Sequence, residues 1–130
     1  MQSIIQLEHV YKRHPVGDGE FEALADINLS FGAGQFAGLV GPSGSGTTTL
    51  PIIIGSLNKP TEGKAIVLGQ DVGGLSNKKS ANLRNEDIGF IFQVFNLLPV
   101  YTVFENVEFA LLLQNIPTTK RKKRVMESLT

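Results

Sequence analysis

A glycine-rich segment at residues 41–48 contains the residue types that bind phosphate groups through the backbone. It reads Gly-Pro-Ser-Gly-Ser-Gly-Thr-Thr and lies between a short apolar run and a helical pattern. Glycines allow positive φ and close approach, so that successive N–H groups can face phosphate oxygens, and a helix start adds partial positive charge. The alternative is a Gly/Ser-rich surface turn without a ligand. The candidate phosphate-binding residues are Gly41, Ser43, Gly44, Ser45, Gly46, Thr47, Thr48 and Thr49.

Side chains at the end of this segment determine how tightly it can bind a nucleotide. The hydroxyl of Thr48 is a candidate ligand for the Mg²⁺ that accompanies a nucleotide. The phosphate-loop pattern G-x-x-x-x-G-K-[S/T] has Lys where this chain has Thr47. Losing a hydrogen bond from that ammonium costs about 1.5–3 kcal/mol, which predicts roughly 10- to 150-fold weaker binding. Pro51, inside the expected helix, predicts a kink or a frayed first turn.

The elements expected around this segment include both strands and helices. Short apolar runs or period-two alternation predict strands at residues 4–10, 24–31, 35–40, 64–68 and 88–92. Helical spacing or a polar surface pattern predicts helices at residues 47–57, 76–84, 102–114 and 118–130. Thr102 and Glu105 have the spacing of a capping box. The glycine-rich segment therefore lies between a buried strand and a helix, which is the context that a phosphate-binding loop requires.

The composition of the 130 residues restricts the class of protein. Twelve basic and 12 acidic residues give a formal net charge of zero, so the chain as a whole does not favour a nucleic-acid partner. The lack of cysteine excludes disulfides and thiolate metal sites. The first residues have no secretory signal pattern, and no apolar run is long enough to cross a bilayer. We expect one folded domain in the cytoplasm.

Two further groups of polar residues carry no clear motif. Residues 120–124 are five consecutive basic residues in the last expected helix. Such a run can bind nucleic acid or anionic lipid, but a solvated helix face fits the zero net charge better. His9 and His14 are expected to be surface imidazoles.

Five short stretches together resemble the N-terminal part of the ATP-binding subunit of ABC transporters. The stretches are residues 41–46, 60–63, 88–93, 96–99 and 105–107. The first resembles the phosphate-binding loop of that family, and the third resembles the strand that leads into its Q-loop. The resemblance covers nearly all 130 residues and is greatest to the branch of lipoprotein-release, macrolide-efflux and peptide-efflux proteins.

The resemblance implies an α/β fold, with a P-loop NTPase core and an N-terminal antiparallel β subdomain. If the resemblance holds, residues 1–130 are a partial ABC-type nucleotide-binding domain, truncated before the signature motif and the second acidic motif. The strands expected at residues 35–40 and 88–92 then lack parallel neighbours. Open apolar edges of this kind favour aggregation.

The resemblance also implies ATP and Mg²⁺ as cofactors and assigns roles to two more residues. Tyr11 matches the aromatic residue that stacks on adenine, the alternative being an ordinary tyrosine at a strand end. Gln93 matches the residue that senses Mg²⁺ and the attacking water, and with Thr48 it is a candidate metal ligand. Its alternative is an ordinary polar residue at a strand end. Residues 94–101 match the segment that faces the coupling helix of a membrane subunit.

By resemblance, the chain is the ATP-binding component of an ABC transporter, held at the inner face of the plasma membrane by a membrane subunit. The family's signature motif, second acidic motif, catalytic Glu and switch His have no counterpart in these residues, so no catalytic residue is predicted. The family homodimerises on ATP, but two copies of these residues could not assemble a complete site. We therefore expect weak Mg-ATP binding and no hydrolysis by the 130 residues alone.

Other functions remain open at this point. A non-catalytic interaction module for a transporter membrane subunit needs only the surface around Gln93. A degenerate, non-functional fragment would also explain Thr47. A GTPase or a small-molecule kinase fits less well, because the order of Tyr11, glycine-rich loop and Gln93 is unlike that of those enzymes.

Overall fold

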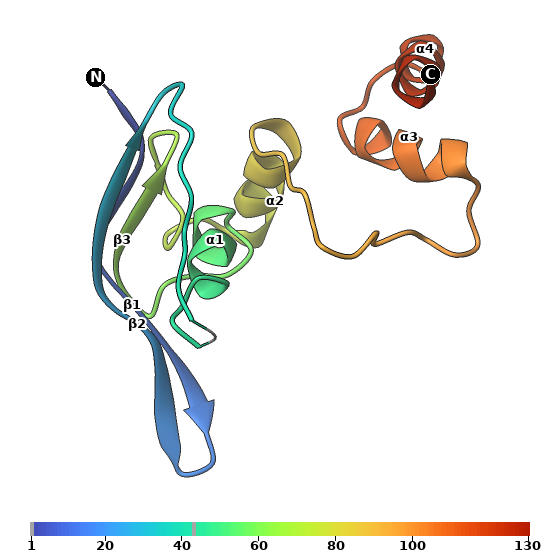
Figure 1. The fold of residues 1–130 in the computed structure, drawn as a ribbon. Coiled ribbons are helices and arrows are strands. Elements are labelled where there is room, and N and C mark those ends of the chain that lie inside the picture. The colour runs from blue at the N-terminus through green and yellow to red at the C-terminus, as the bar shows by residue number, and fades with distance from the viewer. Residues whose placement is uncertain (1, 43) are drawn as a thin grey trace. The chain divides into compact units, whose positions relative to one another are not determined.

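The computed structural model describes residues 2–42 and 44–130 and divides the chain into two compact units, Met1–Ala81 and Asn82–Thr130. Figure 1 shows the elements along the chain. The strands are β1 (Ser3–Val16), β2 (Gly19–Gly32), β3 (Glu62–Val67) and β4 (Gln70–Asp71). The helices are α1 (Thr49–Ile54), α2 (Asn77–Glu86), α3 (Val103–Leu113) and α4 (Thr118–Leu129). None of the helices in the described part is long and apolar enough to cross a membrane.

The first unit is built on an antiparallel sheet with the strand order β2-β1-β3-β4. Strands β1 and β2 form a hairpin of two 14-residue strands, which is longer than the predicted strands. The hairpin turn is confined to two residues and includes Gly17 with φ +58°. Most of the residues between the strands predicted at 4–10 and 24–31 are therefore also strand, because backbone pairing continues to Val16 and Gly19.

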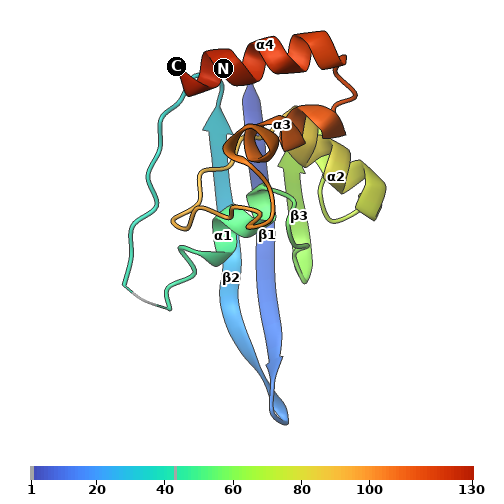
Figure 2. The same ribbon diagram turned by 90° about the vertical axis from the view of Figure 1, so that its right-hand side faces the viewer.

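Helix α1 packs on one face of this sheet, as Figures 1 and 2 show. The core of the unit consists of apolar side chains from the helix, the strands and the segment that follows them, each no more than 5% exposed. They are Leu7, Val10, Leu24, Leu50, Ile53, Ala65, Val67 and Val72. Their burial provides the main favourable term in folding of the unit.

The pairing of β1 with β2 has four register shifts, and two of them, one β-bulge in each strand, reset which side chains face this core. Leu7 pairs with Leu29 and Val10 pairs with Ile27, so β1 has one extra residue between the two pairs. Lys12 then pairs with Leu24, which places the next extra residue in β2 and restores the original register. Strict alternation would point Leu7 and Val10 to opposite faces, and the bulge allows both to be buried.

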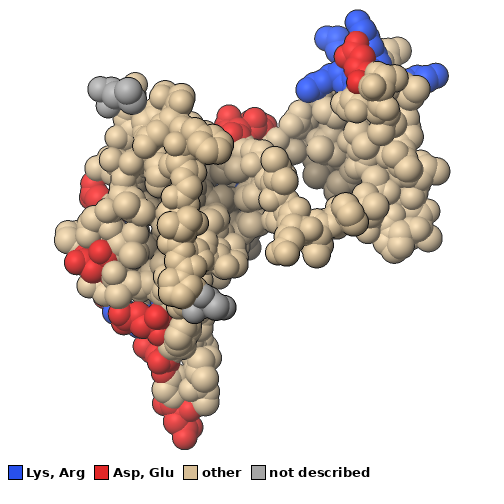
Figure 3. Space-filling model, viewed as in Figure 1, with Lys and Arg blue, Asp and Glu red and all other residues tan. Residues whose placement is uncertain are grey.

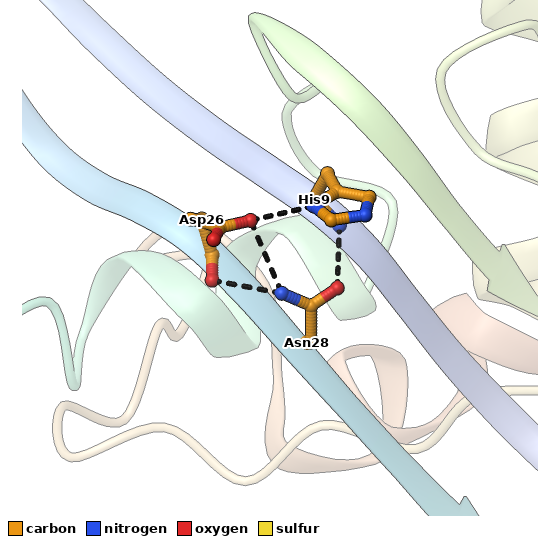
Figure 4. A network of polar contacts seen from close by, with 3 residues as sticks. All are labelled: His9, Asp26 and Asn28. Atoms are coloured by element: carbon orange, nitrogen blue, oxygen red, sulfur yellow. Dashed lines mark hydrogen bonds and ion pairs between the residues drawn. The ribbon is translucent and has the colours of Figure 1, made fainter.

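A polar network connects the two bulges, as Figure 4 shows. His9 and Asp26 both have left-handed backbone conformations, with φ of 48° and 46°. The Nδ1 of His9 lies 2.7 Å from Oδ1 of Asp26, and the His9 N–H donates to Oδ1 of Asn28 at 2.9 Å. The Asn28 amide donates to the backbone oxygen of Asp26 at 3.0 Å and to its carboxylate at 3.1 Å. The network offsets the strain of two non-glycine residues at positive φ.

His9 is a surface imidazole as predicted, with 76% of its side chain exposed, but its contact with Asp26 was not anticipated. His14 lies near the hairpin turn, where it pairs with Phe21. Neither histidine belongs to a metal-binding cluster among the described residues.

The bulge in β1 also dictates a glycine in the neighbouring strand. Gly63 in β3 has φ +87°, and a Cβ at this position would lie 2.6 Å from the carbonyl oxygen of Glu8 and closer still to that of His9. A side chain here would have to displace the backbone of β1. Gly63 is therefore required both by its conformation and by the approach of the bulge.

Replacing Gly63 by alanine is predicted to destabilise the first unit by about 2–4 kcal/mol, because it adds a backbone clash to the cost of positive φ. The matched control is Gly69→Ala, since Gly69 has φ +80° but open space around a Cβ. The control should cost only about 1–2 kcal/mol. Urea unfolding followed by circular dichroism measures both. An equal loss of unfolding free energy in the two variants would contradict the proposed clash between a side chain at position 63 and the bulge in β1.

The network also predicts an acid-dependent contribution to stability. The hydrogen bond with His9, followed by that with Asn28, lowers the pKa of Asp26 below its ordinary value. The folded state thus favours the ionised carboxylate, and this stabilisation is present above the unfolded-state pKa of about 4 and disappears as the pH falls through the lower folded-state value. Thermal melts should show Asp26→Asn losing less stability than wild type over that acid range. Asp18→Asn in the hairpin turn should keep the wild-type pH dependence.

Two strands predicted from apolar runs do not form. Residues 35–42 and 88–92 have no regular secondary structure. Phe36 and Ile91 are fully exposed, at 101% and 102%, and Val40 is 95% exposed. The strand pairings in the described ranges involve only β1–β4, so neither segment pairs with a neighbouring strand. An apolar run becomes a parallel strand only when neighbours cover it on both sides.

In the second unit the predicted capping box is confirmed. The N–H of Glu105 donates to the hydroxyl of Thr102 at 3.1 Å, and the N–H of Thr102 donates to the carboxylate of Glu105 at 2.7 Å. Helix α3 begins directly after Thr102, as expected from these two satisfied donors. Helix α4, the helix predicted at residues 118–130, packs against α3 and is amphipathic.

Candidate functional site

The glycine-rich loop has the backbone conformation predicted for it at its two described central glycines. Gly44 and Gly46 have φ of +84° and +90°. The N–H of Ser45 donates to the carbonyl of Pro42 at 3.1 Å, which closes a turn between them. Gly41 lies against Ser45, and Ser43 falls outside the described residues.

Helix α1 begins at Thr49, two residues later than the helix predicted at residues 47–57, and ends at Ile54. This start places Pro51 in the first turn of the helix, where the backbone N–H needs no partner within the helix. The helix accommodates Pro51 because it begins late, at Thr49. This late start is consistent with the predicted fraying of the first turn. Because α1 has only six residues, its dipole contributes little to an anion site.

The loop and β2 together form a shallow hollow of about 140 Å³. Its lining consists of Phe21 and Ala23 from β2 and Gly44, Gly46, Thr47, Thr48 and Thr49 from the loop. At Gly46 an added Cβ would lie 2.7 Å from the carbonyl oxygen of Ala23 and 2.8 Å from Cδ2 of Leu24. Gly46 is thus the point at which the loop rests directly on the strand.

Phe21 and Ala23 were not anticipated as part of this site. Phe21 is half exposed at the start of β2, and its position two residues before Ala23 is only the alternation expected of a strand. The packing of the loop against β2 depends on contacts between segments about 20 residues apart. No local pattern in the sequence indicates that packing.

The residues that line the hollow fit a phosphate group bound through the backbone. The N–H groups of Thr48 and Thr49 have no hydrogen-bond acceptor within the described residues. Thr48 is exposed and its hydroxyl does not cap α1, which leaves that oxygen free for Mg²⁺. Thr47 is half-buried in the lining and supplies no positive charge. An anion here would be held by N–H groups and by Mg²⁺, since the described residues that line the hollow include no lysine or arginine.

Tyr11 does not line this hollow. The guanidinium of Arg13 lies 4.9 Å from the centroid of the Tyr11 ring, in a cation–π contact that covers one ring face. Arg13 is held there by Glu62 at 2.7 Å and Glu22 at 3.2 Å, from the two neighbouring strands. The hydrogen bonds with Glu62 and then Glu22 raise the pKa of Arg13 above its ordinary value. The ring face that Arg13 covers is therefore not available for stacking.

Gln93 belongs to the second unit, in the exposed segment without regular secondary structure. Gln93 and the glycine-rich loop thus belong to different units of the chain. The segment that follows it, predicted to face a partner, exposes large apolar side chains, among them Phe95 and Val100, each 90% exposed.

A second, apolar hollow of about 290 Å³ lies between this segment and the start of α3. Its lining consists of Leu97, Leu98, Pro99, Tyr101, Val103, Asn106 and Val107. The Asn106 amide oxygen accepts from the N–H of Leu98 at 2.8 Å, and its NH₂ group donates to the carbonyls of Leu98, Tyr101 and Thr102. One side chain on α3 thus fixes the backbone of residues 98–102.

Comparison with known proteins places the chain in a family. The ABC transporter family matches residues 24–130, which include the glycine-rich loop, the segment of Gln93 and the apolar hollow. This chain belongs to the ABC transporter family. The family predicted from the five short stretches is therefore confirmed.

Individual relatives agree with this assignment. The chain is 48% identical over 108 residues to the methionine import ATP-binding protein MetN of Cupriavidus pinatubonensis, covering 83% of this chain and 31% of MetN. It is 36% identical over 129 residues to the macrolide export ATP-binding/permease protein MacB of Photorhabdus laumondii, covering 99% of this chain and 20% of MacB. MacB represents the macrolide-efflux proteins named in the predicted branch.

A solved structure extends the comparison to three dimensions. The ATP-binding cassette MJ0796 of Methanocaldococcus jannaschii, a dimer bound to ADP and Pi, matches with a TM-score of 0.87 and 37% identity. The match covers 95% of this chain and 54% of that cassette. The chain thus spans about half the length of several relatives that it matches. The α/β class and the N-terminal antiparallel sheet predicted from the sequence are confirmed.

Replacing Gly46 by alanine is predicted to lift the loop from β2, because the Cβ would collide with the backbone of Ala23. Gly44→Ala is the matched control, with similar φ and open space around its Cβ. In calorimetric titration with inorganic tripolyphosphate and Mg²⁺, Gly46→Ala should weaken binding at least several-fold more than Gly44→Ala. Equal affinities would argue against β2 as the support of the loop.

Proposed function

We propose that residues 1–130 form part of a nucleotide-binding domain that provides ATP binding for an ABC transporter. The observation that carries the proposal is the glycine-rich loop, which rests on β2 with free N–H groups at Thr48 and Thr49 and lies within the region matched by the family. Membership of the family indicates ATP as the ligand, and the backbone N–H groups of the loop are donors that suit its phosphates.

In this proposal the phosphates of ATP are held by backbone N–H groups from Gly44 to Thr49, and Gly41, Ser43 and Ser45 are the remaining phosphate-binding candidates of the loop. Thr48 and Gln93 supply oxygen ligands to Mg²⁺, which neutralises charge on the phosphates when bound. In this proposal the face of the Tyr11 ring opposite Arg13 stacks on adenine. MJ0796, with ADP and Pi bound in its solved structure, supports the choice of an adenine nucleotide.

Binding by this loop is weak, because Thr47 provides no ammonium group for the β- and γ-phosphates. The same absence impairs hydrolysis, since negative charge develops on the transferred phosphoryl group next to this position. The 130 residues alone bind Mg-ATP weakly and do not hydrolyse it, and none of them is a catalytic residue.

The partner in this proposal is a transporter membrane subunit, contacted through residues 94–101. This contact holds the protein on the inner face of the plasma membrane. Two copies of the 130 residues do not form a complete ATP site, although MJ0796 is a dimer. The exposed apolar side chains of residues 94–101 support this segment as the contact surface.

A second candidate function is a non-catalytic module that binds the membrane subunit without using ATP. The apolar hollow beside α3 favours it, because Asn106 holds the hollow in shape without any ligand. Binding to a membrane subunit that is unaffected by removal of ATP would support this candidate over the first.

The position of Thr47 provides the decisive test. Thr47→Lys is expected to bind Mg-ATP roughly 10- to 150-fold more tightly than wild type, because an ammonium group then reaches the phosphates. Thr47→Gln is the control of similar length without charge and should bind like wild type. Isothermal titration calorimetry measures all three affinities, and circular dichroism checks that each protein is folded.

The outcomes separate the candidates. Tighter binding by the Lys variant alone supports the loop as the nucleotide site. If none of the folded proteins binds Mg-ATP, the proposal fails for these 130 residues. The interaction module or a non-functional fragment then remains. Wild-type affinity equal to that of the Lys variant would contradict the role given to Thr47.

A further inference from the structure

The five consecutive basic residues of α4 do not all serve the same purpose. Arg121 turns inward, where its Nε lies 3.2 Å from the carboxylate of Glu108 on α3 and its Nη1 donates to the carbonyl of Ile116 at 2.7 Å. Val125, one turn further along, is fully buried. Arg121 and Val125 therefore attach α4 to the rest of its unit.

The other four basic residues remain on the surface. We call Lys120, Lys122, Lys123 and Arg124 the basic face of α4. All four are exposed, and none of their side chains has an ion pair or hydrogen bond with another described residue. Figure 3 shows Lys and Arg gathered over α4, where Asp and Glu occur in only a small area. The only acidic residue of the helix is Glu127.

Apolar side chains lie exposed next to these charges. Met126 is 49% exposed and Leu129 is 45% exposed. Lys122, Met126 and Leu129 have the i, i+4, i+7 spacing that places residues on one side of a helix. A helix that carries exposed apolar side chains beside Lys and Arg has the composition of helices that lie in a membrane interface.

We propose that α4 binds directly to the surface of an anionic lipid bilayer. The basic face contacts lipid phosphate groups, and Met126 and Leu129 enter the boundary between headgroups and acyl chains. This contact is separate from the proposed contact with a membrane subunit and requires no nucleotide. It would orient the second unit on the bilayer.

A nucleic acid also offers phosphate groups, but the structure favours lipid. The chain has zero net charge, and the unpaired basic cluster extends over a single helix. Exposed Met126 and Leu129 contribute nothing to contacts with a phosphate backbone, whereas they add buried apolar area on a bilayer.

The test compares two triple variants that remove the same charge. Lys120→Gln, Lys122→Gln and Lys123→Gln act on the basic face, and the control changes Lys64, Lys78 and Lys79 to Gln, which are exposed lysines on β3 and α2. Each protein is sedimented with vesicles of equal parts phosphatidylglycerol and phosphatidylcholine and with vesicles of phosphatidylcholine alone. Circular dichroism checks the fold of each variant.

Wild type and control are expected to bind the phosphatidylglycerol vesicles, and the α4 variant to bind at least about tenfold more weakly. Binding should fall at about 0.5 M salt and on phosphatidylcholine alone. No vesicle binding by wild type, or equal losses in the two triple variants, would overturn the proposal. Tighter binding of wild type to a DNA duplex than to the vesicles, lost in the α4 variant, would overturn it in favour of nucleic acid.

Discussion

The central strand β1 has to bury Leu7 and Val10 on one face, and this requirement determines much of the first unit. Their spacing of three residues is incompatible with regular alternation, so β1 contains an extra residue at the level of His9. The compensating bulge in β2 then restores the register at Lys12 and Leu24, and a further register shift directly after this pair places Arg13 opposite Glu22. The glycine at position 63 in β3 follows from the same bulge. The extra residue in β1 thus affects all three strands, through the bulge in β2 and the glycine in β3.

The glycine-rich loop depends on this sheet for its position. It contacts β2 at Ala23 and Leu24, just before the bulge at Asp26, and it has no strand of its own to support it from the preceding side. The loop also has no cationic side chain at position 47. In the proposed function, affinity for a phosphate would therefore depend on the directions of N–H groups, and these directions are set by two glycines and by the surface of β2.

Local sequence patterns predicted the parts of the structure that local interactions stabilise. The capping box of Thr102 and Glu105 is complete within four residues, and positive φ at Gly44 and Gly46 follows from the glycine pattern itself. The bulges were not predictable, because they follow from pairing with two other strands. Residues 35–40 and 88–92 were predicted as strands from apolar runs, yet an apolar run specifies burial and not the partner that provides it. The contribution of Phe21 to the site was missed for a similar reason, since it depends on contacts between distant segments.

Asn106 gives residues 98–102 a property that matters for recognition. With its side chain bound to Leu98, Tyr101 and Thr102, the backbone around the apolar hollow is already ordered by contacts within the unit. A partner that inserts an apolar side chain there has little loop entropy to remove on binding. Association of such a partner would be limited by the encounter and orientation of the two surfaces, without a segment that must fold first.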